Sequence, residues 1–450
     1  MKTVRIRRGL DIPMQGAPEQ VIGTAPPVGS VGLVGDDYVG LKPTMLAQEG
    51  ERVRLGQPLF VDKRNEAAVF TSPGAGIVTA INRGAKRRFE SLVIHLEGDE
   101  QVAFAPGPSD GRSEAPETLR RLLQQSGLWC SLRTRPFGRI PAATATPSSL
   151  FVTALDTNPL AGDPLVAIDE QPELFRHGLA LLRRCLSVPI HLCSRPEAAL
   201  PGSDMEGIES WGFAGPHPAG LPSTHMHFVD PVHPRKEVWH ICAQDVIAIG
   251  RLFATGRFPT ERIVALGGTG FTQPRLVRSR LGASLVDLCR GELTTEGNGS
   301  RLISGSPLDG RAFEERTGYL GRYHRQISVL IEGDGRSLFG WLSPGGDRFS
   351  VTRLFASTLR PGKRFPFLTA VWGGHRAIYP LGVYERVLPL DMIATTLLKT
   401  LAIGDCEKAA ELGCLELIEE DLALCSFVCP GKNEFGPMLR RVLTAIEEGA

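Results

Sequence analysis

The stretch WHICAQDVIAIGRLFATGRFPTERIVALGGTGFTQPRLVRSRLGASLVDLC, from Trp239 to Cys289, decides how the chain is organised. Its first half predicts a helix at the end of an α/β domain, because apolar residues recur at helical spacing between positions 246 and 253. Gly256 then supplies a C-terminal stop. The second half opens with an apolar strand candidate at 263–266, followed by the glycine-rich run 267–270.

That glycine-rich run raises the question of a nucleotide site. A phosphate-binding loop opens directly into a helix whose N-terminal N–H groups face the phosphate. Here residues 276–278 alternate like a second strand, a short helical pattern appears only at 285–288, and 301–304 reads as another strand. The order strand, strand, helix, strand predicts a β-grasp domain and speaks against a dinucleotide loop.

Composition sets the broad class of the protein. The length of 450 residues allows about three domains. Lys+Arg 50 against Asp+Glu 49 gives a formal net charge of +1, which excludes a global field that steers nucleic acid or anionic lipid. The charge balance and the lack of a basic amphipathic helix favour attachment through protein partners, not lipid. No apolar run approaches about 18 residues, so we expect no transmembrane segment.

Two further features bear on the compartment. The N-terminus, MKTVRIRRGLDIPM, is positive but has no apolar core after it, so it does not read as a signal peptide. The nine cysteines are odd in number and unevenly spread, which suits a reducing compartment better than a disulfide framework. We therefore expect a protein that is cytosolic or attached to something membrane-bound.

Residues 31–97 carry short apolar pairs between glycine turns, notably at 55–60 and 73–78, which is typical of a small all-β sandwich. The pattern resembles the biotinyl/lipoyl-type barrel-sandwich fold. A carrier domain of that type presents its modified lysine in a Met-Lys segment at a hairpin tip, and Lys63 is not preceded by methionine. We therefore favour a structural or docking module. Residues 98–113, rich in Gly and Pro, read as a linker.

The next segment predicts a Rossmann-like α/β domain. Helices are expected from Pro116 to Gly127 and from Asp169, as the cap, to Leu186, and buried strands at 151–155 and 189–193. No G-x-G-x-x-G motif follows any of these strands, so dinucleotide binding is not expected.

Half of the histidines lie between 213 and 240, and they are His217, His225, His227, His233 and His240. His225 and His227, two positions apart, are expected to share one face of a strand. Three interpretations of these histidines are open: a zinc or iron site, an ordered loop of hydrogen-bonded imidazoles, and a small-molecule or quinone contact. The Gly-Pro-His-Pro-Ala-Gly context favours the ordered loop, so we assign no metal ligands.

The rest of the chain divides into strands and then helices. Antiparallel strands are expected at 326–333, 337–341 and 349–353. From Asp391 an apolar stripe predicts a helix that ends at Gly404, and Asp405 can cap a second helix that stops at Gly413.

Several segments of this chain, in the same order along the sequence, resemble one known family from end to end. The matching segments are Gly215–Pro222, Ile263–Gly268, Pro274–Arg278, Tyr319–His324, Glu385–Asp391 and, most specifically, Leu412–Pro437. They resemble the A subunits of the bacterial sodium-translocating NADH:quinone reductases. We identify the chain as similar to that family over its whole length.

The resemblance implies a peripheral subunit on the cytoplasmic face of the bacterial inner membrane. The complex of that family reduces ubiquinone with NADH and exports sodium ions. The resemblance implies that FMN, riboflavin, FAD and iron–sulfur centres lie in the partner subunits, B to F, and that this chain is non-redox and inactive alone. It would contribute to assembly and to the ubiquinone end of the reaction, with no catalytic residue and no nucleic-acid partner.

The family is related to the flavin-binding peripheral subunits of complex I-type and Rnf-type complexes, from which this chain departs. Those relatives wrap the flavin phosphate with glycines, whereas this chain has bulky residues at 128–133. Those relatives also bind an iron–sulfur cluster in their C-terminal helices, through four cysteine thiolates. Here Cys425 and Cys429 are spaced C-x-x-x-C, with Cys406 and Cys414 upstream and Lys432 where a ligand is expected. We interpret these cysteines as packed thiols and expect no cofactor on this chain.

The resemblance and the residues together predict a multidomain α/β plus β architecture. The predicted parts are a barrel-sandwich module with linker at 1–110, the Rossmann-like domain at 111–258, a β-grasp (SLBB-like) domain at 259–312, an antiparallel β extension at 313–384, and a C-terminal helical domain of degenerate iron–sulfur type at 385–450.

Four residues are of the right type to contact a quinone, namely Trp129, Phe137, Arg139 and His217. A quinone head group needs an apolar slot with a few donors to its carbonyls. The competing hypotheses are an independent soluble flavin- or NADH-binding oxidoreductase, an iron–sulfur electron carrier, and a multidomain scaffold. The absent glycine fingerprint and the cysteine spacing speak against the first two.

Overall fold

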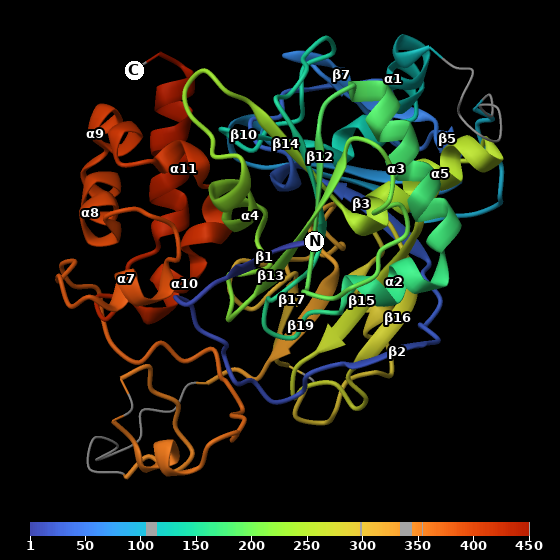
Figure 1. Cartoon of the computed structure of the whole chain (residues 1–450). Coiled ribbons are helices and arrows are strands. Elements are labelled where there is room, and N and C mark those ends of the chain that lie inside the picture. Colours follow the sequence, from blue (N-terminus) through green and yellow to red (C-terminus); the bar gives the residue numbers. More distant parts are fainter. Residues whose placement is uncertain (105–114, 298, 334–343, 353, 450) are drawn as a thin grey trace.

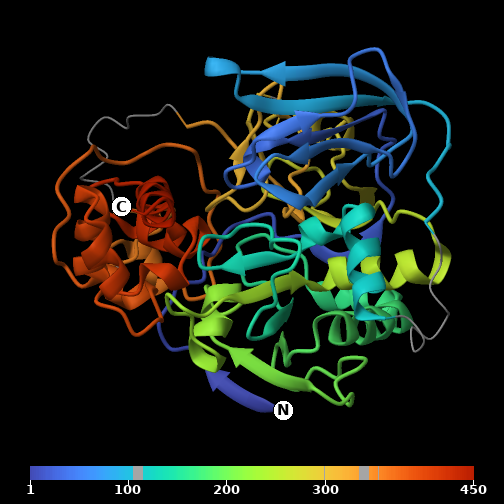
Figure 2. The same cartoon turned by 90° about the horizontal axis from the view of Figure 1, so that it is seen from above.

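The computed structural model describes residues 1–450 except 105–114, 298, 334–343, 353 and 450 (Figure 1). Within these residues the strands form four sheets. Figure 2 shows the N-terminal sheets and the C-terminal helices lying on different sides of the central α/β part.

The N-terminal part is the predicted small all-β sandwich. One sheet has the order β3 (Ser30–Val34), β9 (Phe89–Leu96), β8 (Gly76–Arg83) and β5 (Arg52–Val53). The other has the order β4 (Pro43–Met45), β6 (Pro58–Asp62) and β7 (Asn65–Thr71). The two sheets share one apolar core, in which the rings of Phe60 and Phe70 stack with centroids 4.6 Å apart. Lys63 and Arg64 form the turn between β6 and β7.

The central sheet has six strands in the order β1 (Lys2–Arg5), β13 (Ile208–Ala214), β12 (Ile190–Ser194), β11 (Leu150–Ala154), β14 (Val238–Cys242) and β10 (Arg133–Arg135). All neighbours are parallel except β14 and β10. Side chains alternate between the faces of β11: Leu150 and Val152 face one core, and Phe151 faces another. Strands buried on both faces are typical of a parallel sheet covered by helices.

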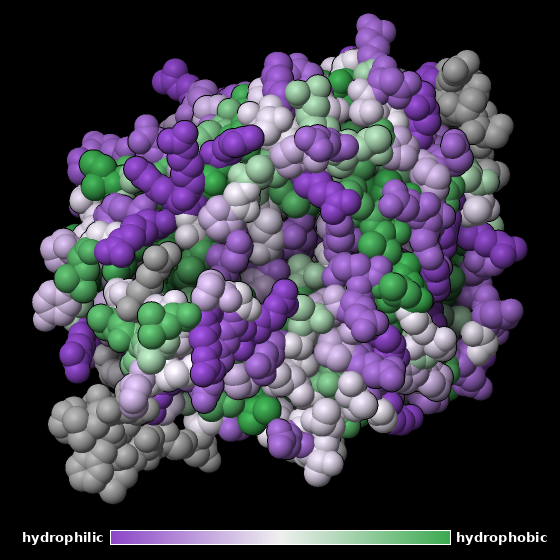
Figure 3. All heavy atoms as spheres, turned by 60° about the horizontal axis from the view of Figure 1, so that its bottom comes forward, coloured by the Kyte–Doolittle hydropathy of each residue, from purple (hydrophilic) through white to green (hydrophobic). Residues whose placement is uncertain are grey.

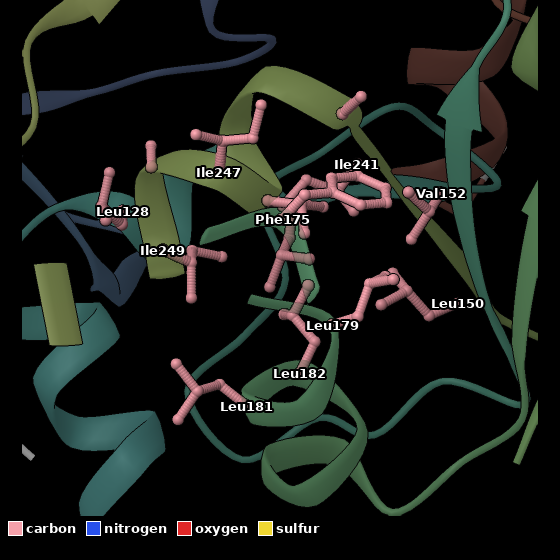
Figure 4. Packing of buried hydrophobic residues seen from close by; sticks show 14 of the residues in the cluster. Leu128, Leu150, Val152, Phe175, Leu179, Leu181, Leu182, Ile241, Ile247 and Ile249 are labelled. Carbon is pink, nitrogen blue, oxygen red and sulfur yellow. The ribbon is translucent and has the colours of Figure 1, made fainter. Parts of the chain in front are cut away.

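Helices on one face of this sheet form the largest core. They are α1 (Pro116–Gln125), α2 (Pro164–Glu170), α3 (Pro172–Leu186) and α5 (Ala243–Thr255). Figure 4 shows Phe175, Leu179 and Leu182 of α3 directed toward Ile249 of α5 and Leu150 of the sheet. Each such fully buried side chain contributes about 1.5–3 kcal/mol. On the other face, α4 (Pro222–Val229) contacts β11.

The predicted cap of α3 is wrong. Asp169 lies inside α2, and the residue that precedes α3 is Gln171, followed by Pro172 in the first turn. The sequence pattern gave no sign of α2, whose own cap is Asp163: its carboxylate accepts from the N–H of Leu165 at 3.0 Å. Asp169 precedes Pro172 by three residues, which in the sequence is consistent with a cap of α3. In the structure the chain is already helical at Asp169, because α2 begins after its own cap, Asp163.

The second six-stranded sheet contains the strands expected after Gly256. Its order is β18 (Arg311–Ala312), β17 (Arg301–Ser304), β19 (Gln326–Leu330), β15 (Glu261–Gly267), β16 (Arg275–Arg280) and β2 (Glu19–Gly23). The short helix α6 (Leu285–Leu288) lies between β16 and β17, so the predicted order strand, strand, helix, strand is confirmed. Gly256 ends α5 in the left-handed conformation, as expected of a helix stop.

The region 313–384 differs from the prediction. Its strand β19 pairs with β15 and β17 and so belongs to the preceding sheet. The expected strand at 337–341 lies outside the described residues. The expected strand at 349–353 is wrong, since Val351 and Thr352 form a turn. Phe349 packs instead against the rings of Phe365 and Phe367, so aromatic contacts replace a strand ladder.

The C-terminal helices are α7 (Val383–Val387), α8 (Ala394–Ile403), α9 (Cys406–Glu411), α10 (Ala423–Val428) and α11 (Phe435–Glu447). They enclose a core that includes Leu397, Leu401, Phe435 and Leu439. The predicted stop and cap are confirmed: Gly404 ends α8 in the left-handed conformation, and the Asp405 carboxylate accepts from the N–H of Lys408 at 2.9 Å. The predicted start at Asp391 is three residues early, because α8 begins at Ala394. No helix in the described ranges is long and apolar enough to cross a membrane.

Candidate functional site

A cavity of about 430 Å³ lies where the N-terminal sandwich, residues 134–142 and the end of α11 meet. It is lined by Asp37, Tyr38, Val39, Leu41, Asp62, Arg64, Asn65, Phe70, Thr134, Phe137, Gly138, Arg139, Ile140, Pro141, Ala142, Glu237, Tyr323, Glu447 and Glu448. Two of the four residues predicted from the sequence, Phe137 and Arg139, line this cavity.

Aromatic rings form one wall. The ring of Tyr38 meets Phe70 edge-on at 4.6 Å and Tyr323 at 6.1 Å between centroids. The hydroxyl of Tyr323 donates to the Cys130 carbonyl at 2.9 Å, and the Arg133 guanidinium lies 4.6 Å from the ring centroid. Burial raises the pKa of both tyrosines, so this wall stays uncharged at neutral pH.

Another part of the lining is a polar loop, which contacts with three other parts of the chain hold in place. The Arg139 guanidinium donates to the Glu447 carboxylate of α11 at 2.7 Å and to the Val39 carbonyl at 2.7 Å. Asn65 of β7 donates to the carbonyls of Ile140 and Pro141 at 3.0 Å each. Because these contacts come from three parts of the chain, the cavity depends on the folded arrangement of all three.

Trp129 lies behind this loop and not on the cavity surface. It belongs to a 3-10 turn, Leu128–Ser131, and is fully buried. Its indole N–H donates to the Pro141 carbonyl at 2.9 Å, and its ring meets Trp239 edge-on at 5.5 Å. Trp129 therefore supports the loop that carries Arg139.

His217 lies apart from the other three residues, in the loop before α4. It is 2% exposed, with Nδ1 3.1 Å from the Thr157 hydroxyl, and its backbone N–H donates to Asp11 at 2.9 Å. Burial lowers the pKa of its imidazole to about 4, so the ring is neutral at physiological pH.

The expectation that His225 and His227 share a strand face is wrong, because Pro222 opens helix α4, which carries both. His225 Nε2 lies 2.9 Å from the Ala219 carbonyl, and His227 Nδ1 lies 2.8 Å from Glu416. No cluster of three or more metal-ligating side chains occurs among the described residues. Both imidazoles are therefore held on α4 by contacts with other parts of the protein.

The residues around Gly127 do not fit a flavin phosphate. Gly127 is left-handed, but Leu128, Trp129, Cys130 and Leu132 after it are buried among apolar neighbours. Cys425 and Cys429 lie in the C-terminal core, where Cys429 is 3.1 Å from the Tyr384 hydroxyl and accepts from the N–H of Asn433 at 3.4 Å. These residues do not fit an iron–sulfur cluster either.

A buried ionic cluster, missed by sequence reasoning, joins the α/β part to the C-terminal helices. We call Arg135, Ser223, His240, Glu420 and Asp421 the Arg135 junction. The fully buried guanidinium donates to Ser223 Oγ at 3.1 Å, His240 Nε2 at 3.0 Å and Glu420 at 3.3 Å, and Ser223 donates to Asp421 at 2.7 Å. Burial raises the pKa of Asp421 to about 7, while the nearby guanidinium opposes this rise.

Three family models match the chain. They are described as the NqrA N-terminal barrel-sandwich hybrid domain, over residues 4–97, the NqrA second alpha/beta domain, over 115–258, and the NQRA C-terminal domain, over 263–315. The first match confirms the barrel-sandwich reading, and the second confirms an α/β domain after it.

Curated relatives match over nearly the whole chain. The A subunit of the Na(+)-translocating NADH-quinone reductase of Pseudomonas aeruginosa (strain UCBPP-PA14) is 53% identical over 446 residues, and that of Neisseria gonorrhoeae (strain NCCP11945) is 51% identical over 446 residues. Both alignments cover 99% of this chain and 99% of the relative. Among solved structures, the NAD+-reducing [NiFe]-hydrogenase in the H2-reduced state aligns at a TM-score of 0.38 and 15% identity. That alignment covers 76% of this chain and 63% of the hydrogenase chain, and it has no bearing on activity.

Proposed function

Because this chain belongs to the NqrA family, the A subunits of the Na(+)-translocating NADH-quinone reductases, we propose that it is the peripheral, non-redox subunit of such a reductase. The assembly would reduce ubiquinone with NADH and export sodium ions. The observation that carries the proposal is the identity of 51% and 53% over 446 residues with two such subunits.

We further propose that electrons do not pass through this chain. The bulky residues after Gly127 and the spacing of Cys425 and Cys429 support this division of labour, because they leave no place for a flavin phosphate or a cluster. The flavins and iron–sulfur centres would lie in the partner subunits, B to F. The chain would be attached at the cytoplasmic face of the bacterial inner membrane.

We also keep the five-part division at 1–110, 111–258, 259–312, 313–384 and 385–450 as a proposal, with a Rossmann-like second part and a β-grasp third part. The parallel order of the central sheet and the position of α6 between β16 and β17 support these two fold assignments. The pairing of β19 with β15 and β17 favours moving the third boundary beyond Leu330.

Gene replacement tests the assembly proposal. The chain, carrying an affinity tag, is expressed in a Pseudomonas aeruginosa strain that lacks its own NqrA. We expect the remaining subunits to co-purify with the chain and sodium-dependent NADH:quinone reduction to return. An empty tag is the control. Absence of both co-purification and activity, with the chain folded, would refute the proposal.

The 430 Å³ cavity is our proposed contact for the ubiquinone head group. Its aromatic wall offers an apolar slot, and Arg139 and Arg64 are the cationic donors near quinone carbonyls. Of the four residues predicted from the sequence, we propose direct contact for Phe137 and Arg139. Trp129 and His217 are buried and hydrogen-bonded, so we assign them supporting roles.

Binding of a short-chain ubiquinone analogue to the purified chain tests this site. We expect saturable binding that weakens about tenfold in Arg139→Gln, the typical effect of losing one charge-assisted hydrogen bond. Arg195→Gln is the matched control, because Arg195 also pairs with a carboxylate, that of Asp163 at 2.9 Å, far from the cavity. Equal affinity for both variants would remove the cavity from consideration.

The same sample tests the competing function of a soluble flavin- or NADH-binding oxidoreductase. Such an enzyme, purified with its flavin, shows visible absorption and oxidises NADH on its own. We expect neither. Flavin absorption in stoichiometric amount would favour the competing function.

A further inference from the structure

Large apolar side chains stand exposed on one segment of the chain, residues 344–381, which we call the 344–381 lobe. They are Leu354, Leu359, Leu368, Val371, Trp372, Tyr379 and Leu381, with exposed fractions between 43% for Leu368 and 83% for Leu359. Elsewhere, exposed large apolar residues are scattered along the sequence, which is ordinary for a protein surface. We take their concentration on one segment as the starting point for an interaction surface.

The lobe has an aromatic interior of its own. The ring centroid of Phe349 is 5.9 Å from that of Phe365 and 5.5 Å from that of Phe367, and Phe367 is 6.2 Å from Phe427 of α10. These phenylalanine rings therefore pack against one another and against α10. The exposed leucines, Val371 and Trp372 are outside this interior, and the described part of the chain leaves them exposed.

Backbone hydrogen bonds fix the lobe to the body of the protein. The N–H of Phe365 donates to the Pro13 carbonyl at 2.8 Å, and the N–H of Gln15 donates to the Phe365 carbonyl at 2.9 Å. The N–H of Arg376 donates to the Gly431 carbonyl at 3.0 Å. Figure 1 shows the segment, in orange, projecting below the C-terminal helices.

The 344–381 lobe is also rich in positively charged side chains. The sequence 344–381 contains one carboxylate, Asp347, and the Lys363 ammonium neutralises it. Arg360, Arg364 and Arg376 are exposed, and the Arg348 guanidinium lies 5.2 Å from the centroid of the Trp372 ring. Figure 3 shows hydrophobic and hydrophilic residues mixed on the surface next to the grey atoms at the lower left. A net charge of +1 for the chain thus conceals a strongly basic segment.

We propose that the 344–381 lobe docks onto an anionic lipid surface. Leu354, Leu359 and Trp372 enter the boundary between headgroups and acyl chains, and the arginines pair with lipid phosphates. Separate apolar loop tips with interspersed arginines suit a bilayer, which requires no shape complementarity, and tryptophan is enriched at this depth. The proposal stands independently of the quinone site and replaces the expectation, drawn from overall charge, that attachment avoids lipid.

Vesicle binding by the purified full-length chain tests the proposal. Vesicles of phosphatidylcholine alone are compared with vesicles that also contain phosphatidylglycerol, by co-sedimentation and tryptophan emission. We expect binding and a blue shift only with the anionic vesicles, with affinity falling as salt rises. Trp372→Phe should remove most of the blue shift and leave sedimentation nearly unchanged.

Two sets of variants locate the surface. Arg360→Gln, Arg364→Gln and Arg376→Gln should weaken partitioning about fivefold for each arginine removed. Leu354→Ser with Leu359→Ser should weaken it at least about tenfold. The matched controls, which should bind like the unaltered chain, are the exposed Arg88→Gln, Arg176→Gln and Arg257→Gln, and Val21→Ser.

Three results would overturn the proposal. The first is no binding to anionic vesicles at low salt. The second is binding that the lobe variants and the control variants reduce equally. The third is unchanged vesicle binding in the lobe variants together with lost co-purification of partner subunits, which would assign the lobe to a protein interface. Because every altered side chain is exposed, unchanged thermal melting confirms that the variants are folded.

Discussion

Replacing Arg135 by methionine tests whether the Arg135 junction holds the C-terminal helices to the α/β part. Methionine keeps the apolar stem and offers no donor, so Ser223, His240 and Glu420 each lose a hydrogen bond from the guanidinium. Removing one partner of a buried ion pair costs about 3–5 kcal/mol. Glu420 is 22% exposed and can be rehydrated in part, so we expect a loss of about 3 kcal/mol at pH 8.

The loss should shrink at lower pH. The Arg135 guanidinium opposes protonation of both Asp421 and His240 in the folded protein, and it thereby lowers the pKa of each. In the variant both pKa values are higher in the folded state, while the unfolded chains are alike. Protons therefore bind the folded variant more readily than the folded wild type, and acidification stabilises the variant relative to the wild type. The window spans the pKa of about 7 for Asp421.

Urea unfolding at pH 8 and pH 6, followed by tryptophan fluorescence, measures both effects. Trp239 is adjacent to His240 on β14 and reports on the junction. Arg195→Met, which removes an exposed arginine from its pair with Asp163, is the control and should cost about 1 kcal/mol or less. A loss for Arg135→Met no larger than that of the control, or one that grows on acidification, would refute the reasoning.

Three further predictions concern the core, a turn and a titration. Phe175→Ala should lower the free energy of unfolding by about 3–5 kcal/mol, measured by urea unfolding, because Phe175 is fully buried in the largest core. Gly127→Ala should lower the melting temperature more than Gly50→Ala: both glycines are left-handed, but only at Gly127 would the added Cβ meet Thr71 Oγ1, at 2.7 Å. Equal effects would contradict this contact. Since burial lowers the pKa of His217 to about 4, the unfolded chain protonates first as the pH falls below 6.5, and stability should decline by roughly 3 kcal/mol between pH 6.5 and 4. His217→Asn should flatten that decline, and an unchanged slope would show that other groups cause it.

Local signals in the sequence were sufficient for elements that depend on local physics. The helix stops at Gly256 and Gly404 and the cap at Asp405 follow from backbone conformation and a single side-chain hydrogen bond, and all three are found where expected.

Elements held by distant partners could not be predicted in this way. Strands β1, β2 and β10 are short and rich in charged or polar residues, and they exist because of ladders to residues far along the chain. The alternation of His225 and His227 suggested a strand, yet the proline before them allowed a helix and packing against β11 decided for it.

The candidate site shows the same limit. Residue type and family resemblance pointed to Phe137 and Arg139, but the cavity also needs Tyr38 and Asn65 from the sandwich and Tyr323 from much later in the chain. No periodicity or motif relates these positions, because the cavity forms only when separate parts of the fold meet. Trp129 was chosen for its aromatic ring, which the fold uses for packing.

The two strands at the N-terminus have a consequence for synthesis in the cell. β1 is the edge strand beside β13, and β2 is the edge strand beside β16. Residues 2–5 therefore lack their sheet partner until the chain has grown past residue 214, and residues 19–23 lack theirs until it has grown past residue 280. The sandwich between Ser30 and Leu96 closes through its own ladders well before that point. A chain that loses its first residues to a protease would uncover the edges of both large sheets at once, and open sheet edges template aggregation.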